Sequence, residues 1–240
     1  MDRYEDLLIE ELEKLSIPCR EDQATLLCKH LDLVIRRNKE MNLTRIDSVE
    51  DGLYLHIIDS LICLRSLKSL TAEKHILDLG TGAGFPGIPL AVMLDADVTL
   101  LDSISKKAAA VEGFLIALGL SARCVSMCSR SEDLARMVPN SFEIVAARAV
   151  AQTNVLIEYA APLLGSGGIL CAWKAHITEE ELSAALRAAD ICGMRIVSRE
   201  TYELPRNYGH REIVYLQRVG DPSILLPRRC GMAAKRPLGL

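Results

Sequence analysis

The sequence predicts an α/β fold: a mostly parallel, doubly wound sheet of seven strands, with an antiparallel pair at its C-terminal end and a helical cap at its N-terminal end. Three observations support this class. Apolar residues first recur at helical spacing, strand-like and helix-like segments alternate from residue 75 onward, and two strand-like segments then follow one another directly. Alternating strands and helices build parallel sheets, whereas consecutive strands pair in the antiparallel sense.

The expected cap occupies residues 1–72 and contains three helices. Each of the first two carries its apolar residues on one face, and the third begins near Ser48 with a capping-box-like S-V-E-D sequence. The apolar residues are Tyr4, Leu7, Leu8, Leu12 and Leu15 in the first helix, Leu27, Leu31 and Val34 in the second, and Ile57, Leu61 and Leu64 in the third.

A core over residues 73–220 follows the cap. The expected strands are 75–79, 97–102, 122–127, 142–147, 168–173, 194–202 and 211–218, and the expected helices are 86–94, 104–118, 152–164 and 178–191. In such a sheet the ligand binds at the carboxyl ends of the parallel strands, so the functional residues are expected there.

Composition sets limits on the partners. Half of the 240 residues are apolar, which suffices for one large core, and no apolar run approaches the ~20 residues that span a bilayer. The acidic first helix is unlike a signal peptide, so we expect a cytoplasmic protein without a membrane partner. The net charge of −4 argues against indiscriminate nucleic-acid binding, yet residues 195–240 hold nine Lys or Arg against four Asp or Glu. We therefore expect a polyanion to contact a basic C-terminal segment, residues 221–240.

The eight cysteines form no C-x-x-C pair and have no histidines at metal-ligand spacing. This pattern is typical of free, mostly buried thiols in a reducing compartment, and we expect no metal site.

A glycine-rich segment, G-T-G-A-G-F-P-G over residues 80–87, directly follows the first expected strand. Read from Gly82 it matches the dinucleotide fingerprint G-x-G-x-x-G, and read from Gly80 it matches the G-x-G-x-G pattern of S-adenosylmethionine binders. Glycine permits a positive φ and lets the backbone approach a ligand closely. The antiparallel pair that ends the sheet is typical of the S-adenosylmethionine-dependent methyltransferase fold. It favours methyl transfer and leaves a nicotinamide oxidoreductase as the weaker alternative.

Polar residues at two further strand ends fit a cofactor. Asp102 ends the second strand, 22 residues after Gly80, where a carboxylate accepts the ribose hydroxyls; its alternative role is in a turn or a helix cap. Ser131 and Glu132 follow the third strand. They lie either beside the adenine or in a merely solvated helix start, and the sequence does not decide between these two interpretations.

The segment after the fourth strand limits the chemical groups that can accept the methyl group. It reads A-A-R-A-V-A over residues 146–151, without the Asn/Asp-Pro-Pro-aromatic motif of enzymes that methylate exocyclic amines. The Pro-Cys pair of pyrimidine C5 methyltransferases is also missing.

Six motifs occur in a specific order: H-I-I-D-S-L (56–61), I-L-D-L-G-T-G-A-G-F-P-G-I-P-L-A (76–91), L-L-D-S (100–103), A-R-A-V-A (147–151), P-L-L-x-x-G-G (162–168) and P-R-R-C-G-M-A-A-K-R-P-L (227–238). Together they resemble the bacterial small-subunit ribosomal RNA guanine-N7 methyltransferase family, also called the glucose-inhibited division protein B family. The likeness runs from about Asn42 to the C-terminus. It implies S-adenosylmethionine as the donor and, as acceptor, one guanine of 16S rRNA near the decoding centre, in the small subunit or an assembly intermediate.

The resemblance also implies contacts to the cofactor. It assigns them to Gly80, Phe85, Ser131, Glu132 and Arg148, and our own interpretation of the glycine loop and the second strand end adds Gly82, Gly84 and Asp102. Arg148 is further expected to position donor and acceptor, its alternative role being that of a salt-bridged arginine at a strand end. No catalytic base is assigned, because guanine N7 has a free in-plane lone pair at neutral pH.

The candidates for RNA contact are His56, Lys174, Arg206, Arg228, Arg229, Lys235 and Arg236. His56, Asp59 and Ser60 share one helix face, an arrangement that favours tying the cap to the sheet, or lining the RNA entrance, over a hydrolase triad. The basic segment is expected to dock and face the RNA, with a disordered, solubilising end as the alternative. We expect a monomer.

Some points stay open at this level. The family commonly has Lys-Gly where this chain has Lys174-Ala175, and proline where it has Ala233. Any of Phe85, Tyr54, Trp173 and Tyr208 is a candidate to stack on the target base. Two other functions remain: methylation of another RNA or a small molecule, and cofactor binding without activity.

Overall fold

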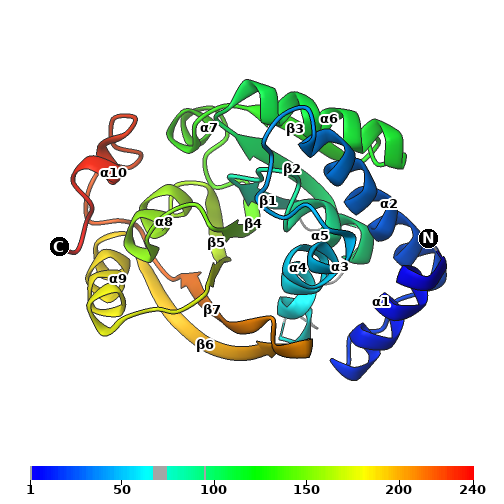
Figure 1. Ribbon diagram of the computed structural model, residues 1–240. Helices are drawn as coiled ribbons and strands as arrows, with labels where there is room; N and C mark the ends of the chain where they lie inside the picture. The colour runs from blue at the N-terminus through cyan, green and yellow to red at the C-terminus, as the bar shows by residue number, and fades with distance from the viewer. Residues whose placement is uncertain (1, 67–74, 95) are drawn as a thin grey trace.

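A computed structural model describes residues 2–66, 75–94 and 96–240 (Figure 1). In this part a seven-stranded sheet has the order β3-β2-β1-β4-β5-β7-β6, in which the first five strands are parallel and β7 is antiparallel to both β5 and β6. The strands are β1 (His75–Leu79), β2 (Asp97–Asp102), β3 (Cys124–Cys128), β4 (Phe142–Arg148), β5 (Leu164–Lys174), β6 (Met194–Leu204) and β7 (Gly209–Arg218). The expected sheet, with its terminal antiparallel pair, is confirmed.

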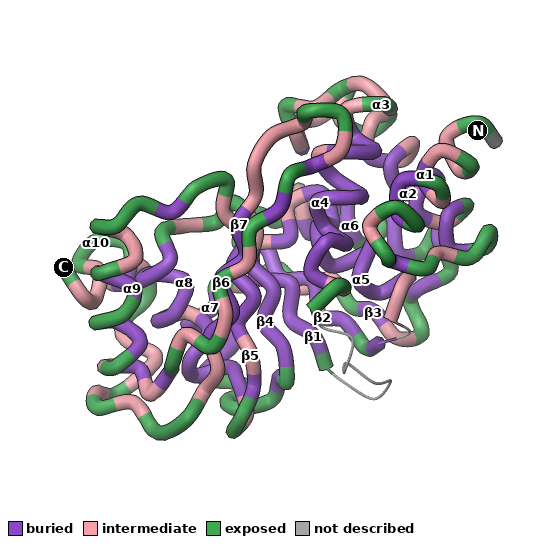
Figure 2. Tube along the Cα trace, turned by 90° about the horizontal axis from the view of Figure 1, so that it is seen from below, coloured by how far each residue is buried: buried purple, intermediate pink, exposed green. Residues whose placement is uncertain are grey.

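Helices cover both faces of the sheet, as Figure 2 shows from below. On one face α5 (Gly87–Leu94) and α6 (Ser105–Leu118) pack with the cap in the larger apolar cluster. On the other face α7 (Ser131–Met137), α8 (Thr153–Ala160) and α9 (Glu179–Ile191) build the smaller cluster. Parallel strands buried on both faces need this double cover.

One helix is shorter than its pattern predicts. The helix expected over residues 152–164 ends at Ala160, and β5 begins at Leu164 rather than at 168. The carbonyls of Pro162 and Leu163 accept hydrogen bonds from the amides of Asn140 and Phe142, so this apolar stretch pairs with the chain before β4. Periodicity alone does not separate a buried helix from a buried strand.

The cap contains the three expected helical segments, but the third is composite. Helices α1 (Asp2–Lys14) and α2 (Glu21–Asn38) precede a run made of α3 (Val49–Gly52), a π-helix (Leu53–Ile58), α4 (Asp59–Leu61) and a 3-10 helix (Ile62–Arg65). Ser48 is the expected N-cap, since its Oγ accepts a hydrogen bond from the Asp51 amide at 3.0 Å. The boundary expected between residues 72 and 73 lies outside the described residues.

The basic segment, residues 221–240, leaves β7 and runs beside α8 and α9 to the C-terminus, opposite the N-terminus (Figure 1). It contains the short helix α10 (Met232–Lys235), and Leu226 and Leu238 pack against the smaller cluster. It is therefore docked on the core, as expected.

The cysteines are free. Cys28, Cys63, Cys124, Cys171 and Cys192 are buried, Cys19 is half-buried, and Cys128 and Cys230 are exposed. Within the described residues, no helix has the length and hydropathy to cross a bilayer, and no three His, Cys, Asp or Glu side chains gather as a metal site.

Candidate cofactor and acceptor site

Two adjoining cavities open at the carboxyl ends of the parallel strands. The larger, of about 660 Å³, lies between the cap, the glycine loop and the ends of β4 and β5. The smaller, of about 220 Å³, lies between the ends of β1 and β2 and the start of α7. Gly80 and Ala151 line both cavities. This is the place where a doubly wound sheet is expected to bind its ligand.

The glycine loop has the backbone that its sequence predicts. Gly80, Gly82 and Gly84 adopt φ values of 73°, 59° and 94°. A Cβ on Gly80 would also lie 2.6 Å from Cγ2 of Val150, whereas one on Gly82 would meet only a carbonyl oxygen 4.0 Å away. Gly80 is thus required by both conformation and packing, and Gly82 leaves space beside the loop for a ligand.

Asp78, on β1, holds this loop and was missed in the sequence. Its Oδ2 accepts hydrogen bonds from the Thr81 hydroxyl at 2.6 Å and from the Gly87 amide at 2.7 Å. Burial raises the pKa of Asp78 to about 6, although these two hydrogen bonds act in the opposite direction. A carboxylate at the end of an otherwise apolar strand, two residues before a glycine loop, was the available signal.

A second unforeseen support comes from the cap. His30, on α2, is completely buried, and its Nε2 donates a hydrogen bond to the Ala83 carbonyl in the glycine loop at 3.0 Å. Burial lowers the pKa of His30 to about 3, so the imidazole is neutral at physiological pH. The cap therefore fixes the loop as well as covering the sheet.

Asp102 makes the turn contacts of its alternative role and also faces the smaller cavity. Its Oδ2 accepts from the Gly82 amide at 3.1 Å and its Oδ1 from the Ile104 amide at 2.9 Å, so it does stabilise a turn. Its carboxylate also lines the smaller cavity. Since each carboxylate oxygen can accept two hydrogen bonds, acceptor capacity is left for a ligand.

Ser131 and Glu132 line the same cavity at the start of α7. Both are buried, with 7% and 6% of their surface exposed, so the alternative of a solvated helix start is wrong. Glu132 Oε2 accepts from the Ser131 hydroxyl at 3.1 Å, and Glu132 Oε1 accepts from the Gly231 amide of the basic segment at 2.7 Å.

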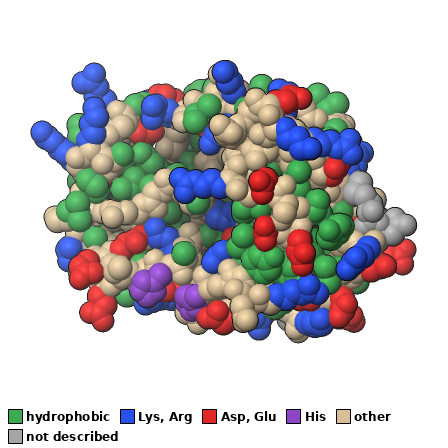
Figure 3. Space-filling model, in the orientation of Figure 1, with side chains coloured by type: hydrophobic (Ala, Val, Ile, Leu, Met, Phe, Trp, Pro, Cys, Tyr) green, Lys and Arg blue, Asp and Glu red, His purple; other side chains and the backbone are tan. Residues whose placement is uncertain are grey.

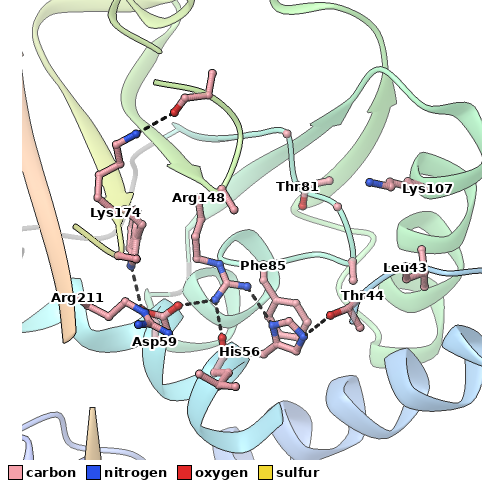
Figure 4. Close-up of a pocket in the computed structure, with 18 of the residues that line it drawn as sticks. Leu43, Thr44, His56, Asp59, Thr81, Phe85, Lys107, Arg148, Lys174 and Arg211 are labelled. Atoms are coloured by element: carbon pink, nitrogen blue, oxygen red, sulfur yellow. Dashed lines mark hydrogen bonds and ion pairs between the residues drawn. The ribbon is translucent and has the colours of Figure 1, made fainter. Parts of the chain in front are cut away.

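Arg148, at the end of β4, joins the sheet to the cap across the larger cavity (Figure 4). Its guanidinium donates to the Leu55 carbonyl at 2.9 Å, to Asp59 Oδ2 at 2.8 Å and to His56 Nδ1 at 3.2 Å. It is thus salt-bridged at a strand end, and it lines the cavity as well. The other oxygen of Asp59 lies 3.2 Å from Nε of Arg211.

His56 belongs to an aromatic stack on the floor of this cavity. Its ring lies parallel to Phe85, with centroids 4.4 Å apart, and its Nε2 donates to the Thr44 hydroxyl at 3.0 Å. Burial, and next the Arg148 guanidinium, lower the pKa of His56 to about 3. His56 is therefore a neutral link between cap and sheet.

The four aromatic candidates for base stacking differ in whether they line a cavity. Tyr54 is fully buried and stacks on Tyr208, with centroids 4.6 Å apart, and neither lines the two cavities. Phe85 and Trp173 both line the larger cavity. The Phe85 ring is covered by His56 and His30, and Trp173 is buried with its indole N–H donated to the Asp59 carbonyl at 2.9 Å.

The basic candidates for RNA contact fall into two groups. Lys174 donates to the Ala151 carbonyl at 3.0 Å and pairs with Glu181, and Arg228 Nε donates to Glu158 Oε1 at 2.7 Å. Arg206 pairs with Glu50 and lies over the Tyr54 ring, with half of its side chain exposed. Arg229, Lys235 and Arg236 are exposed. In Figure 3, Lys and Arg side chains project at the corner where Figure 1 places α10.

The two positions that depart from the family pattern are accommodated. Ala175 is not among the residues with positive φ; instead Ala149, directly after Arg148, adopts a φ of 58°. Ala233 is buried in α10. Ala175 lines the larger cavity, and neither residue lines the smaller one.

Comparisons with known proteins decide the family. A family model for GidB, rRNA small subunit methyltransferase G, matches residues 23–208. Proteins named Ribosomal RNA small subunit methyltransferase G from Desulfitobacterium hafniense and Deinococcus radiodurans are 34% and 38% identical to this chain. The alignments cover 94% and 93% of this chain and 94% and 88% of those proteins. The chain belongs to the GidB family. The expected enzyme class, an S-adenosylmethionine-dependent methyltransferase of ribosomal RNA, is thereby confirmed, and the oxidoreductase alternative is set aside.

Solved structures agree on the fold of this GidB-family protein. The cyclase SpnF has a TM-score of 0.55 at 18% identity, with 68% of this chain and 80% of that chain covered. TYW2 from P. horikoshii, solved in complex with MeSAdo, has a TM-score of 0.52 at 14% identity, with 68% and 62% covered. At these identities the likeness confirms the fold class alone.

Proposed function

We propose that this protein transfers the methyl group of S-adenosylmethionine to N7 of a single guanine in the decoding-region loop of 16S rRNA. One observation carries the proposal: two cavities of different character adjoin at Gly80 and Ala151. The smaller suits the adenosine of the cofactor, and the larger suits its methionine end together with the acceptor base.

The residues of the smaller cavity fit the cofactor. Asp102 has acceptor capacity for the ribose hydroxyls, and Ser131 and Glu132 lie where the adenine would bind. On the side of the larger cavity, Gly82 leaves the space beside the loop free, because a Cβ there would have no neighbour closer than 4.0 Å. Family membership supports the same cofactor.

The larger cavity is lined by cations. Lys107, Lys174, Arg148 and Arg211 line it together with Asp59, and this excess of positive charge suits the cofactor carboxylate and an RNA phosphate. Lys and Arg side chains are visible in the recess near the middle of the face in Figure 3.

The bound cofactor supplies a methyl group activated on a sulfonium, which the guanine N7 lone pair accepts without any proton transfer. The protein therefore has to position and stabilise rather than to act as a base. Arg148 and Arg211 hold the Asp59 carboxylate in the cavity lining. The neutral His56 keeps Arg148 oriented.

We further propose that a monomer acts in the cytoplasm on the small subunit or an assembly intermediate. In this proposal Arg206, Arg229, Lys235 and Arg236 contact RNA phosphates. His56 and Lys174 lie at the cavity wall, and Arg228 fixes the basic segment from its buried ion pair.

The test is methyl transfer from tritiated S-adenosylmethionine to small ribosomal subunits from a strain that lacks its own enzyme. We expect label in the RNA, and its loss with Asp102→Ala and with Arg148→Ala. Gly113→Ala, in α6 with no atom within 4 Å of the added Cβ, is the control that keeps activity. Tight cofactor binding without label in small subunits or their free RNA contradicts the acceptor and favours a small molecule.

A further inference from the structure

The basic segment is held to the core by polar contacts, one of them to a buried carboxylate. Arg228 binds Glu158, a carboxylate that is only 3% exposed, and the Arg228 carbonyl accepts a hydrogen bond from Arg136 at 3.0 Å. Further on, the Leu238 carbonyl accepts from Asn154 at 2.8 Å. Such contacts at both ends fix the path of the intervening residues.

Between these anchors the segment reaches the cofactor site. The Gly231 amide donates to Glu132, the carboxylate that lines the smaller cavity, and Ala234 lines that cavity itself. Gly231 adopts a φ of 76°, which glycine tolerates and which turns the chain into α10. The segment thus borders the cavity assigned to adenosine.

The same short stretch carries exposed charge. Arg229, Lys235 and Arg236 lie within five residues of Gly231 and point to solvent, and no acidic residue follows Asp221. A surface of this kind binds phosphates without reading a base sequence.

We propose that residues 228–236 form the outer wall of the adenosine cavity, and that cofactor binding orders this wall and thereby places Arg229, Lys235 and Arg236 for contact with RNA phosphates. Both halves of this proposal rest on the proposed function: the cofactor half on adenosine binding in the smaller cavity, and the RNA half also on the RNA acceptor. Coupling between two sites is reciprocal, so RNA bound to the wall also raises the affinity for the cofactor. Couplings of this type usually change affinity by about 5-fold to 150-fold.

The first test is hydrogen exchange of the full-length protein with and without S-adenosylhomocysteine. We expect amides 231–234 to exchange at least about fivefold more slowly with the ligand, together with the glycine loop. Protection of residues 80–87 with unchanged exchange at 231–234 overturns the proposal. Unchanged exchange in both places overturns the cofactor site as well.

The second test loosens the wall without touching the cavity. The double variant Glu158→Gln with Arg228→Met removes the ion pair but leaves no unpaired buried charge. We expect its Kd for S-adenosylhomocysteine to rise by about tenfold and its exchange at 231–234 to become insensitive to the ligand. Arg187→Ala is the matched control, since Arg187 contacts the segment only at Gly239, and its Kd should not change. A cofactor Kd unchanged in the double variant contradicts the proposal; its melting curve checks that it folds.

The RNA half is measured separately, by the binding of a labelled small-subunit rRNA fragment. With wild type we expect S-adenosylhomocysteine to tighten RNA binding by about fivefold or more. With Arg229, Lys235 and Arg236 all changed to Ala, RNA binding weakens while the cofactor Kd stays as in wild type. If the affinity for RNA is the same with and without the cofactor analogue, the RNA half of the proposal is overturned. Failure of methyl transfer with the coupling intact would instead count against the proposed reaction.

Discussion

Arg148 shows at the scale of one residue how the cap and the sheet become a single site. One guanidinium makes three contacts with the helical run of the cap while it lines the larger cavity. Only 13% of the Arg148 side chain and 6% of the Asp59 side chain are exposed, so water screens this pair little. The residue that is expected to position donor and acceptor therefore also stabilises the fold.

Replacing Arg148 by Ala should lower the free energy of unfolding by about 2 kcal/mol, because the buried Asp59 loses one of its two arginine partners and the Leu55 carbonyl loses its donor. Urea denaturation measures the change. Arg37→Ala is the control: it removes an ion pair with Glu40 in which 47% and 66% of the two side chains are exposed, and should cost less than about 1 kcal/mol. Equal effects of the two substitutions would show that Arg148 is only a surface residue.

His30 predicts a dependence of stability on pH. Its pKa is about 3 in the folded protein against an ordinary histidine value of 6.5, so the unfolded chain binds the extra proton. This contribution to stability is complete above pH 6.5 and is lost as the pH falls toward 3. Between these limits wild type should lose up to about 1.4 kcal/mol per pH unit more than His30→Gln. Parallel pH profiles of the two proteins would contradict a neutral, buried His30.

The sequence predicted those cavity residues whose conformation or contacts are local. Gly80 and Asp102 follow from a turn and a strand end that a short stretch of chain defines. Asp78 was overlooked because a carboxylate in an apolar strand shows its role only when Thr81 and Gly87 are placed around it. His30 was overlooked because its partner, Ala83, is 53 residues away.

At the scale of elements, the loop after β1 and the turn after β4 fit against each other. The turn contains Ala149 at positive φ, which costs an L-residue about 1–2 kcal/mol, and it brings Val150 against Gly80. Backbone strain of this kind is concentrated at functional sites. The two segments together separate the two cavities.

Gly80→Ala should therefore abolish tight cofactor binding, since Ala disfavours a φ of 73° and its Cβ would lie 2.6 Å from Val150. Calorimetric titration with S-adenosylhomocysteine measures the loss. Gly113→Ala adds the same methyl group to an open helix position, and should leave binding intact while raising the unfolding free energy by about 0.5–1 kcal/mol. Unimpaired binding by Gly80→Ala would show that the loop does not contact the cofactor.

Element type was better predicted than element detail. The alternation of strand-like and helix-like segments predicted the position of every strand, because β-rich runs bounded by helices leave little choice for the strand order along the chain. The π-helix over Leu53–Ile58 has no signature in the apolar spacing, yet it places Leu55 and His56 against Arg148. π-turns are frequently found at functional sites, and they depend on tertiary contacts.

At the scale of the whole molecule, charge is distributed unevenly. The chain has a net charge of −4, while cations gather in the larger cavity and on the exposed side of α10. The sequence predicted the basic end and its docking. It did not show that the segment borders the adenosine cavity, because that contact joins Gly231 to Glu132 across 99 positions.

The exposed cations predict how methylation responds to salt. Each phosphate contact to a single strand contributes about −0.7 to the slope of log affinity against log salt concentration. Changing Arg229, Lys235 and Arg236 to Ala should therefore make the salt slope of KM for small subunits shallower by about 2. The matched variant Arg3→Ala, at the opposite end of the molecule, should keep the wild-type slope. A triple variant with the wild-type slope would place the RNA elsewhere.

The central claim is the acceptor atom, and chemical mapping of the methyl group tests it most directly. Small-subunit RNA methylated by this protein would be treated with borohydride and aniline, which cleave the chain at N7-methylguanine. Methylation at guanine N7 predicts one new cleavage, in the decoding-region loop, that is missing when the RNA has been incubated with Arg148→Ala. Labelled RNA that is not cleaved there would contradict methylation at guanine N7.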